Sequence, residues 1–206
     1  MVRHTGEAPT QAFRFDTADG LRDDVFSQLA AGVATSKHPL HLMAVATSGT
    51  DGRAEARYVV VRAFDSTARS LSFHADARSP KIADIGRDER LTLLLYDPDT
   101  RLQLRIAARA TPHRDDERAF AGWISTAPTS RIGYAQPFAP GEALDANAVW
   151  NPPSEVSLDD PEARSRFVWI DCEIDTIDAL WLNSTGNLRA LLTWTGESWA
   201  MQRLGP

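Results

Sequence analysis

The chain has 206 residues, of which 43% are hydrophobic and 24% charged, and its formal net charge is −6. These values are typical of a globular protein with an ordinary core, and the acidic balance argues against a broad surface for nucleic acid or anionic lipid. The single cysteine, Cys172, excludes an intrachain disulfide and a cysteine-based zinc site, and its mostly apolar surroundings predict a buried, unreactive thiol. No window has the length of a membrane span and the N-terminus lacks an apolar signal-like segment, so we expect a cytoplasmic protein without a membrane partner.

The first part of the chain predicts a loose arm over residues 1–14, a helix and several short strands. Apolar residues recur on one face of the expected helix from Asp16 to Lys37. Alternating and β-branched runs predict strands over residues 41–47, 54–64 and 70–74. A short helix should begin at Ser79-Pro80, with the Ser79 hydroxyl as the N-cap and proline at the first helical position.

The next two strands differ in pattern. Residues 91–96 are almost continuously apolar, which predicts a strand buried on both faces or a central barrel strand. Residues 101–111 alternate, with leucine and isoleucine on one face. The other face carries Arg101, Gln103, Arg105 and Arg109. Such a face indicates an anionic ligand, acidic side chains or a second subunit, unless it is simply solvated.

The remaining chain predicts a helix over residues 115–123, a long surface loop over 124–165, and a strand over 166–174. A hairpin follows over 179–182 and 188–194, with a last strand over 197–204. Short strands with helices only at the edges predict a mainly β fold, an antiparallel barrel of Greek-key type. We expect residues 1–206 to form a single domain.

Basic residues gather around the second strand and the short helix. The start of a helix presents free N–H groups and a partial positive charge, and Lys81 lies in the first turn of the helix expected after Ser79. A lysine there is unfavourable for the helix itself, but it suits a bound anion. With Arg57 and Arg62 at the ends of the second strand, these residues predict a phosphate pocket. The alternative is an ordinary hairpin and helix with solvated basic side chains.

Taken together, several short motifs resemble the pyridoxine/pyridoxamine 5′-phosphate oxidase family, and more closely its oxidase-related members. The resemblance rests on Arg57-x-Val-Val-Val-Arg62, Phe73-His74-x-Asp76-x-x-Ser79-Pro80-Lys81, Gln103-Leu104-Arg105-Ile106, Ser130-x-Ile132-Gly133 and Arg203-Leu204-Gly205-Pro206. It implies a split β-barrel that binds FMN at the interface of a homodimer. The residues that it places at the cofactor are Arg57, Tyr58, Val59, Val60, Arg62, His74, Ala75, Ser79, Lys81, Gln103 and Trp181. Gln103 would reach the flavin from the partner subunit.

The resemblance also implies a small-molecule substrate, oriented by Arg62, Ser130 and Arg189. The family's two other grips on the substrate phosphate, a tyrosine and an arginine, are absent from Gly122 to Thr126. Pro80 replaces a phosphate-binding arginine, which leaves Arg57, Lys81 or Arg78 to hold the cofactor phosphate.

The resemblance implies an FMN-dependent oxidoreductase, with O2 or a reduced nicotinamide as the other partner, no metal and no assigned catalytic residue, since the cofactor carries the chemistry. The alternatives are a low-turnover module that binds flavin or pyridoxal phosphate, a barrel that binds deazaflavin or haem, and a barrel without a cofactor.

Overall fold

The computed structural model describes residues 13–206, so most of the predicted N-terminal arm, residues 1–12, lies outside the described residues. In chain order the elements are α1 (Ala18–Ala34), the 3-10 helix η1 (Pro39–His41), β1 (Leu42–Ser48), β2 (Ala54–Val60), β3 (Ala63–Asp65), β4 (Ser70–Asp76), α2 (Pro80–Arg87), β5 (Arg90–Asp97), β6 (Leu102–His113), α3 (Glu117–Ser125), α4 (Pro128–Ala135), α5 (Pro161–Arg166), β7 (Phe167–Trp181), β8 (Leu188–Trp194) and β9 (Trp199–Leu204). The predicted mainly β architecture with peripheral helices is confirmed.

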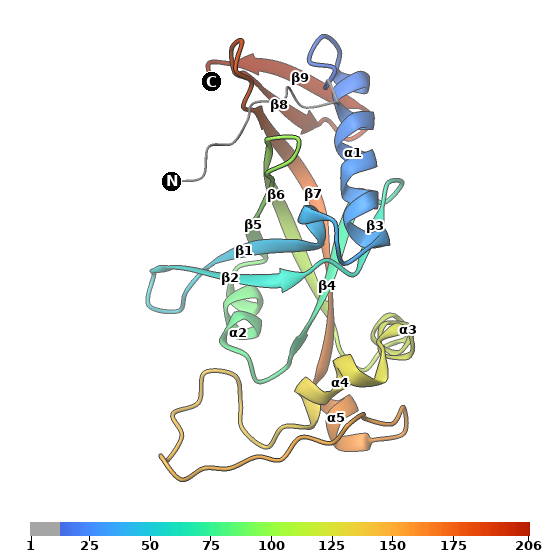
Figure 1. Cartoon of the computed structure of the whole chain (residues 1–206), viewed down its shortest axis with the longest axis vertical. Helices are drawn as coiled ribbons and strands as arrows, with labels where there is room; N and C mark the ends of the chain where they lie inside the picture. Colours follow the sequence, from blue (N-terminus) through green and yellow to red (C-terminus); the bar gives the residue numbers. More distant parts are fainter. Residues whose placement is uncertain (1–12) are drawn as a thin grey trace.

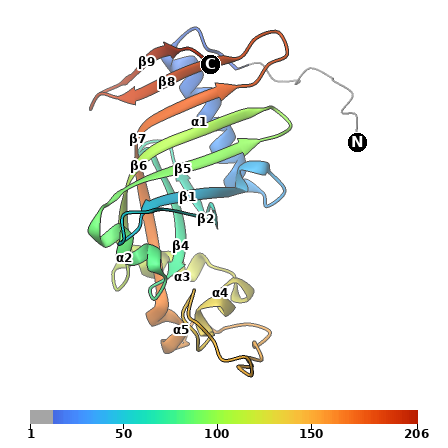
Figure 2. The same ribbon diagram turned by 90° about the vertical axis from the view of Figure 1, so that its left-hand side faces the viewer.

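The strands form one nine-stranded sheet in the order β2-β1-β5-β6-β7-β4-β3, and β8 and β9 extend it from β7. All pairings are antiparallel, and β7 is its longest strand, with 15 residues. The first half of β7 pairs with β4 and its second half pairs with β8, while β6 follows it along the other side with a register shift at Ala107/Ala108. The sheet therefore divides at β7 into a β4 branch and a β8–β9 branch (Figures 1 and 2).

The chain between β2 and β3 brings the two ends of the sheet together. The backbone N–H of Val61 donates to the carbonyl of His41 beside β1, and that of Arg62 donates to the carbonyl of Ser72 in β4. The strand predicted over residues 54–64 is therefore interrupted at these two residues, because their hydrogen bonds go to different partners. This crossing places Arg62 next to β4.

Two apolar clusters hold the structure together. The larger one fills the space between the sheet and α1, whose Leu21, Val25 and Leu29 are buried as the helical periodicity predicts. The smaller one lies between α3, α4, α5 and the start of β7, and it includes Trp123, Tyr134, Phe167 and Trp169. In Figure 1 these three helices lie at the lower end of the molecule, and β8 and β9 lie at the upper end.

Of the two alternatives for residues 91–96, the structure shows a central strand, because β5 lies between β1 and β6, and it contradicts burial on both faces. In β5, Leu91, Leu93 and Leu95 are at most 5% exposed, whereas Leu94 is 42% and Tyr96 46% exposed. The outer face of β5 is thus apolar but uncovered within one chain. Leu42 of β1 and Tyr58 of β2 are also exposed on the neighbouring strands, by 51% and 77%.

Four further expectations need correction. Phe13 is buried against Trp181, with ring centroids 5.7 Å apart, so the arm is packed from this residue onward. The predicted loop over residues 124–165 contains α4 and most of α5. The strands expected over 166–174 and 179–182 are one strand, β7. Arg101 lies in the turn before β6 with a φ of 59°, and so does not belong to the predicted arginine face.

Cys172 is buried as predicted, and burial raises the pKa of its thiol. No helix within residues 13–206 has the length and hydropathy needed to cross a membrane.

Candidate functional site

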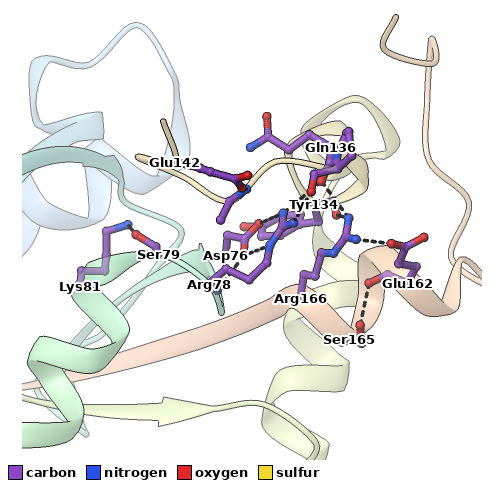
Figure 3. A network of polar contacts seen from close by, with 12 residues as sticks. Asp76, Arg78, Ser79, Lys81, Tyr134, Gln136, Glu142, Glu162, Ser165 and Arg166 are labelled. Atoms are coloured by element: carbon purple, nitrogen blue, oxygen red, sulfur yellow. Dashed lines mark hydrogen bonds and ion pairs between the residues drawn. The ribbon is translucent and has the colours of Figure 1, made fainter. Parts of the chain in front are cut away.

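The turn from β4 into α2 carries the predicted phosphate-binding residues. Pro80 occupies the first turn of α2 and Ser79 is its N-cap residue, as expected. The Ser79 hydroxyl does not cap the helix backbone, however; it accepts a hydrogen bond from Lys81 Nζ at 2.6 Å (Figure 3). The lysine is drawn back over the start of its own helix, and this leaves the free N–H groups of the first turn beside an ammonium group.

Arg57 of β2 lies near this lysine. Burial and then the charge of Arg57 lower the pKa of Lys81, while Asp76 acts in the opposite direction. Two like charges at the start of a helix disfavour each other, so an anion placed between them would be stabilised by both. This is the charge arrangement that the sequence predicted.

The sequence did not predict the acidic partner of Arg57. Arg57 Nη1 donates to Thr47 Oγ1 at 2.6 Å, and its Nη2 lies 3.6 Å from Asp84 Oδ2. Thr47 in turn donates to the same Asp84 oxygen at 2.9 Å. Asp84 is 3% exposed and anchors the guanidinium from within α2. Because Asp84 balances one of the two cations, the group of Arg57, Lys81 and Asp84 keeps a single excess positive charge, and this still fits a phosphate.

Arg78 is not available for that phosphate, contrary to the expectation that it shares the role. Its guanidinium forms an ion pair with Asp76, with Nη2 2.7 Å from Oδ2. It also donates to the backbone carbonyls of Gln136 and Pro137, each at 3.1 Å. Figure 3 shows Arg78 directed toward Asp76 and the end of α4, away from Lys81. Arg78 therefore fastens the chain after α4 to the β4–α2 turn, with Arg166 donating to the carbonyls of Tyr134 and Gln136 from the other side.

Arg62 is different from the arginines around it. Within residues 13–206 its side chain has neither an ion pair nor a hydrogen bond, and its buried Nε has no partner. Burial lowers the pKa of Arg62. Arg62 also lines a pocket of about 240 Å³ together with Val61, Thr126 and Trp169. A half-buried cation without a carboxylate, beside a pocket, is suited to an anionic ligand.

His74 lies on β4 and faces the smaller apolar cluster. Its Nδ1 is 2.5 Å from the Tyr134 hydroxyl oxygen, and its Nε2 is buried without a partner. Burial, followed by the charge of Arg62, lowers the pKa of His74 to about 3, so the ring is neutral at physiological pH. Tyr134 was not among the predicted site residues; its position within the Ile132 to Pro137 segment was noted only as part of the resemblance.

Ser130 lies in the first turns of α4, close in sequence to the pocket residues Ser125 to Ala127. The segment from Gly122 to Thr126, which lacks the family's tyrosine and arginine, is closely packed. A Cβ on Gly122 would lie 2.4 Å from Trp169 Cε3, and the Thr126 hydroxyl donates to the Gly122 carbonyl at 2.8 Å.

The other predicted residues of β2 and β4 differ in burial. Tyr58 is exposed, Val59 and Val60 are partly buried, and Ala75 is 7% exposed. Together with Arg57, Arg62, His74, Ser79 and Lys81, they make up the first group of predicted site residues, on or beside β2, β4 and α2.

Gln103, Trp181 and Arg189 form a second group, on β6, β7 and β8, where the sheet continues toward β9. The Trp181 ring N–H donates to the Thr100 carbonyl at 3.0 Å. Arg189 is bound to Asp178 by two hydrogen bonds of 2.9 and 2.8 Å. Figure 1 shows β8 at the upper end of the molecule and α4 at the lower end, so within one chain Arg189 of β8 lies apart from Ser130 of α4.

Comparisons with known proteins agree with this architecture. Residues 24–113 match the family model described as pyridoxamine 5′-phosphate oxidase, FMN-binding domain. A pyridoxine/pyridoxamine 5′-phosphate oxidase of Anaeromyxobacter dehalogenans is 32% identical over 105 residues, which are 51% of this chain and 52% of the relative. That of Burkholderia multivorans is 29% identical over 175 residues, covering 80% of this chain and 78% of the relative. The chain thus spans about half the length of the Anaeromyxobacter relative and 78% of the Burkholderia relative.

The fold is also found in a solved structure. A pyridoxamine 5′-phosphate oxidase-related, FMN binding protein from Nostoc punctiforme superposes with a TM-score of 0.74 at 23% identity, covering 90% of this chain and 96% of that one. This confirms the split-barrel fold class. The residues matched by the family model contain β2, β4, α2 and all of β6, whereas Ser130, Trp181 and Arg189 lie beyond them. Residues 24–113 are therefore similar to the FMN-binding domain of the pyridoxamine 5′-phosphate oxidase family.

Proposed function

We propose that this protein is an FMN-dependent oxidoreductase that acts on a small anionic substrate. The observation that carries the proposal is the arrangement of Lys81 and Arg57 at the start of α2. Among residues 13–206 the Lys81 ammonium group hydrogen-bonds only to the uncharged Ser79 hydroxyl, and the pKa of Lys81 is lowered by burial and by Arg57. This unfavourable placement of a cation is relieved when the FMN phosphate binds there.

The bound flavin supplies two-electron redox chemistry, and the protein supplies binding and orientation. In the proposal Arg57, Ser79 and Lys81 hold the phosphate. Residues of β2 and β4 that lie beside them, Tyr58 to Val60 and His74-Ala75, border the rest of the cofactor. The electron acceptor, O2 or a nicotinamide, is left to experiment.

Arg62 is the proposed substrate-orienting residue, with Ser130 nearby on α4. Its guanidinium lines the pocket of about 240 Å³ and has no acidic partner among the described residues. The pocket offers one arginine, and its walls combine apolar side chains such as Val33 and Trp169 with polar ones such as Thr126. Pyridoxamine 5′-phosphate is a poor fit, because the segment from Gly122 to Thr126 lacks the tyrosine and arginine that bind its phosphate in the family.

A homodimer is part of this proposal. Gln103, Trp181 and Arg189 lie apart from the Arg57 group within one chain, and an exposed apolar face that includes Leu94 and Tyr58 separates them. Covering this face with a second copy would bury the apolar side chains and bring the second group of one subunit to the first group of its partner.

A second candidate is a flavin- or pyridoxal-phosphate-binding module with little turnover. The observation in its favour is that Arg189, expected to orient the substrate, is bound to Asp178 by two hydrogen bonds along one edge of its guanidinium. A residue held in this way is less free to grip a substrate.

The decisive experiment is an absorption spectrum of the purified protein after addition of FMN and desalting. We expect flavin bands near ~450 nm to be retained, because the cofactor itself absorbs there. Photoreduced, anaerobic protein is then mixed with O2 or an oxidised nicotinamide, and oxidised protein with candidate substrates, beginning with pyridoxamine 5′-phosphate, for which we expect no reaction. Loss of the flavin on desalting would refute the proposal. Retention with no reduction by any substrate would favour the binding module.

A further inference from the structure

His74 and Tyr134 form a buried polar pair within an aromatic environment. The Tyr134 hydroxyl oxygen lies 2.5 Å from His74 Nδ1, and it comes from α4, 60 residues away in the chain. The ring of Phe167 packs against both, with centroid distances of 5.3 Å to His74 and 5.2 Å to Tyr134. Aromatic rings on this side exclude water from the hydrogen bond and fix the orientation of the imidazole.

The opposite nitrogen of the same imidazole has no partner. Among residues 13–206, four buried side-chain nitrogens lack a hydrogen bond, and these are Arg62 Nε, Arg69 Nε, His74 Nε2 and Arg131 Nε. Arg69 and Arg131 stack on tryptophan rings, 4.1 and 5.0 Å from the ring centroids, and each donates a hydrogen bond from at least one terminal nitrogen. Arg62 and His74 have no such compensation. A buried donor without an acceptor is unfavourable, so these two atoms indicate a place where a ligand oxygen binds.

The position of the imidazole proton follows from counting donors. Burial raises the pKa of Tyr134, so its hydroxyl keeps its proton, and His74 is neutral. If His74 carried its proton on Nδ1 and donated it to the tyrosine oxygen, the tyrosine O–H would need a further acceptor. Nε2 would then be an acceptor without a donor, which makes two unsatisfied groups. If Tyr134 donates to Nδ1, the tyrosine donor is satisfied and only the Nε2–H group is left. The second arrangement leaves one unsatisfied polar group instead of two.

We propose that Tyr134 is a positioning residue, which holds His74 as the Nε2–H tautomer so that Nε2 and the Arg62 guanidinium donate hydrogen bonds to an oxygen of a molecule bound at the flavin site. This inference rests on the proposed function, since the oxygen belongs either to FMN or to a carboxylate substrate beside it. The chemistry is the same for both sources: a neutral donor and a cationic donor directed to one acceptor. Tyr134 acts through His74 and contacts neither molecule.

The tautomer can be measured without ligand by nitrogen NMR of the imidazole groups in the ligand-free protein at near-neutral pH. We expect wild-type His74 to carry its proton on Nε2, with Nδ1 as an acceptor. In Tyr134→Phe the Nδ1 atom loses its donor, and we expect a mixture of both tautomers. Tyr96→Phe, which removes a hydroxyl from a 46% exposed tyrosine, is the matched control and should leave the His74 signals unchanged.

The source of the oxygen is identified by adding FMN alone, and then benzoate as a planar carboxylate. A shift of the Nε2–H proton on addition of FMN assigns the oxygen to the flavin, and a shift only after benzoate assigns it to the substrate. The ligand that causes the shift should bind about three- to tenfold more weakly to Tyr134→Phe, the effect of one neutral hydrogen bond.

Three results would overturn the inference: a wild-type proton on Nδ1, an unchanged tautomer in Tyr134→Phe, or no shift with either ligand. The wild-type measurement decides the first of these even if Tyr134→Phe does not fold. Failure of the wild-type protein to retain FMN would refute the proposed function instead. In that case the ligand-free tautomer would still be known.

Discussion

Replacing Lys81 by methionine should separate binding of the flavin phosphate from binding of the flavin ring. Methionine keeps the unbranched apolar stem of lysine and removes the ammonium group, which in the structure has only the Ser79 hydroxyl as a hydrogen-bond partner, at 2.6 Å. A hydrogen bond to a charged group contributes about 1.5–3 kcal/mol, so we expect FMN to bind roughly 10- to 150-fold more weakly. The assay is titration of FMN fluorescence with wild-type and variant protein.

Riboflavin provides the internal reference because it lacks the phosphate. Its affinity should change by less than about threefold in Lys81→Met, since its ring contacts involve other residues. Lys37→Met is the matched control: the chain has one other lysine, in the exposed segment after α1, and this substitution should change neither affinity. Equal losses for FMN and riboflavin, or an FMN affinity within about twofold of wild type, would refute the phosphate assignment.

For the stability of the ligand-free protein we expect Lys81→Met to have the opposite effect to its effect on FMN binding. Burial and the Arg57 charge lower the pKa of Lys81, which means that the folded protein without ligand disfavours its charge. Removing the ammonium group should therefore leave the free energy of unfolding of the ligand-free protein unchanged or raise it, as measured by urea denaturation. A residue that weakens the free protein and strengthens ligand binding is typical of a binding site. A clear loss of stability in Lys81→Met would instead indicate a structural role.

Three other predictions concern packing, protonation and assembly. Gly122→Ala should lower the free energy of unfolding by about 1–3 kcal/mol in urea titrations, because its Cβ would lie 2.4 Å from Trp169 Cε3 in a filled cluster. His74, whose pKa is lowered from 6.5 to about 3, should make wild-type stability fall as the pH drops below 6.5, since the unfolded state then binds the proton first. His74→Gln should lack that component, a difference of about 2–3 kcal/mol between about pH 7 and about pH 4; parallel pH profiles would contradict it. Leu94→Glu on the exposed face of β5 should convert a dimer to a monomer in sedimentation experiments, and an unchanged sedimentation coefficient would contradict the proposed interface.

The β2 strand and the start of α2 could be predicted because their signals are local. A β-branched run and a Ser-Pro helix start each depend on a few consecutive residues. Whether each basic side chain is free to bind a ligand could not be predicted in the same way. Arg78 is taken up by Asp76, only two residues earlier, and by carbonyls near residue 136, whereas Arg62 is left free. The difference is set by how α4 packs against β4, which the local sequence does not contain.

The errors in the strands have a similar origin. In β5 both faces are apolar, so the sequence has no alternation, although only one face is buried within the chain. In β7 the polar residues Asp175 and Thr176 looked like a break between two strands. The structure continues through them because β6 pairs along the whole length, with the register shift at Ala107/Ala108 opposite this point. Periodicity identified the strands but could not show which apolar face is covered, or by what.

The uncovered face of β5 also explains how residues far apart in one chain can serve one site. Arg57 is on β2, an end strand of the sheet path, whereas Arg189 is on β8, which extends the sheet beyond β7. Arg57 and Arg189 lie on opposite sides of the β5–β6 pair in the sheet order, and no rotation of a side chain joins them. In the proposed dimer, apolar residues such as Leu94 provide the buried centre of the interface, and a twofold axis through this centre places the first group of one subunit beside the second group of its partner. The apolar outer face of β5 is the reason that its sequence shows no alternation. In the proposed dimer, the same face forms the contact that brings residues of both subunits to the cofactor site.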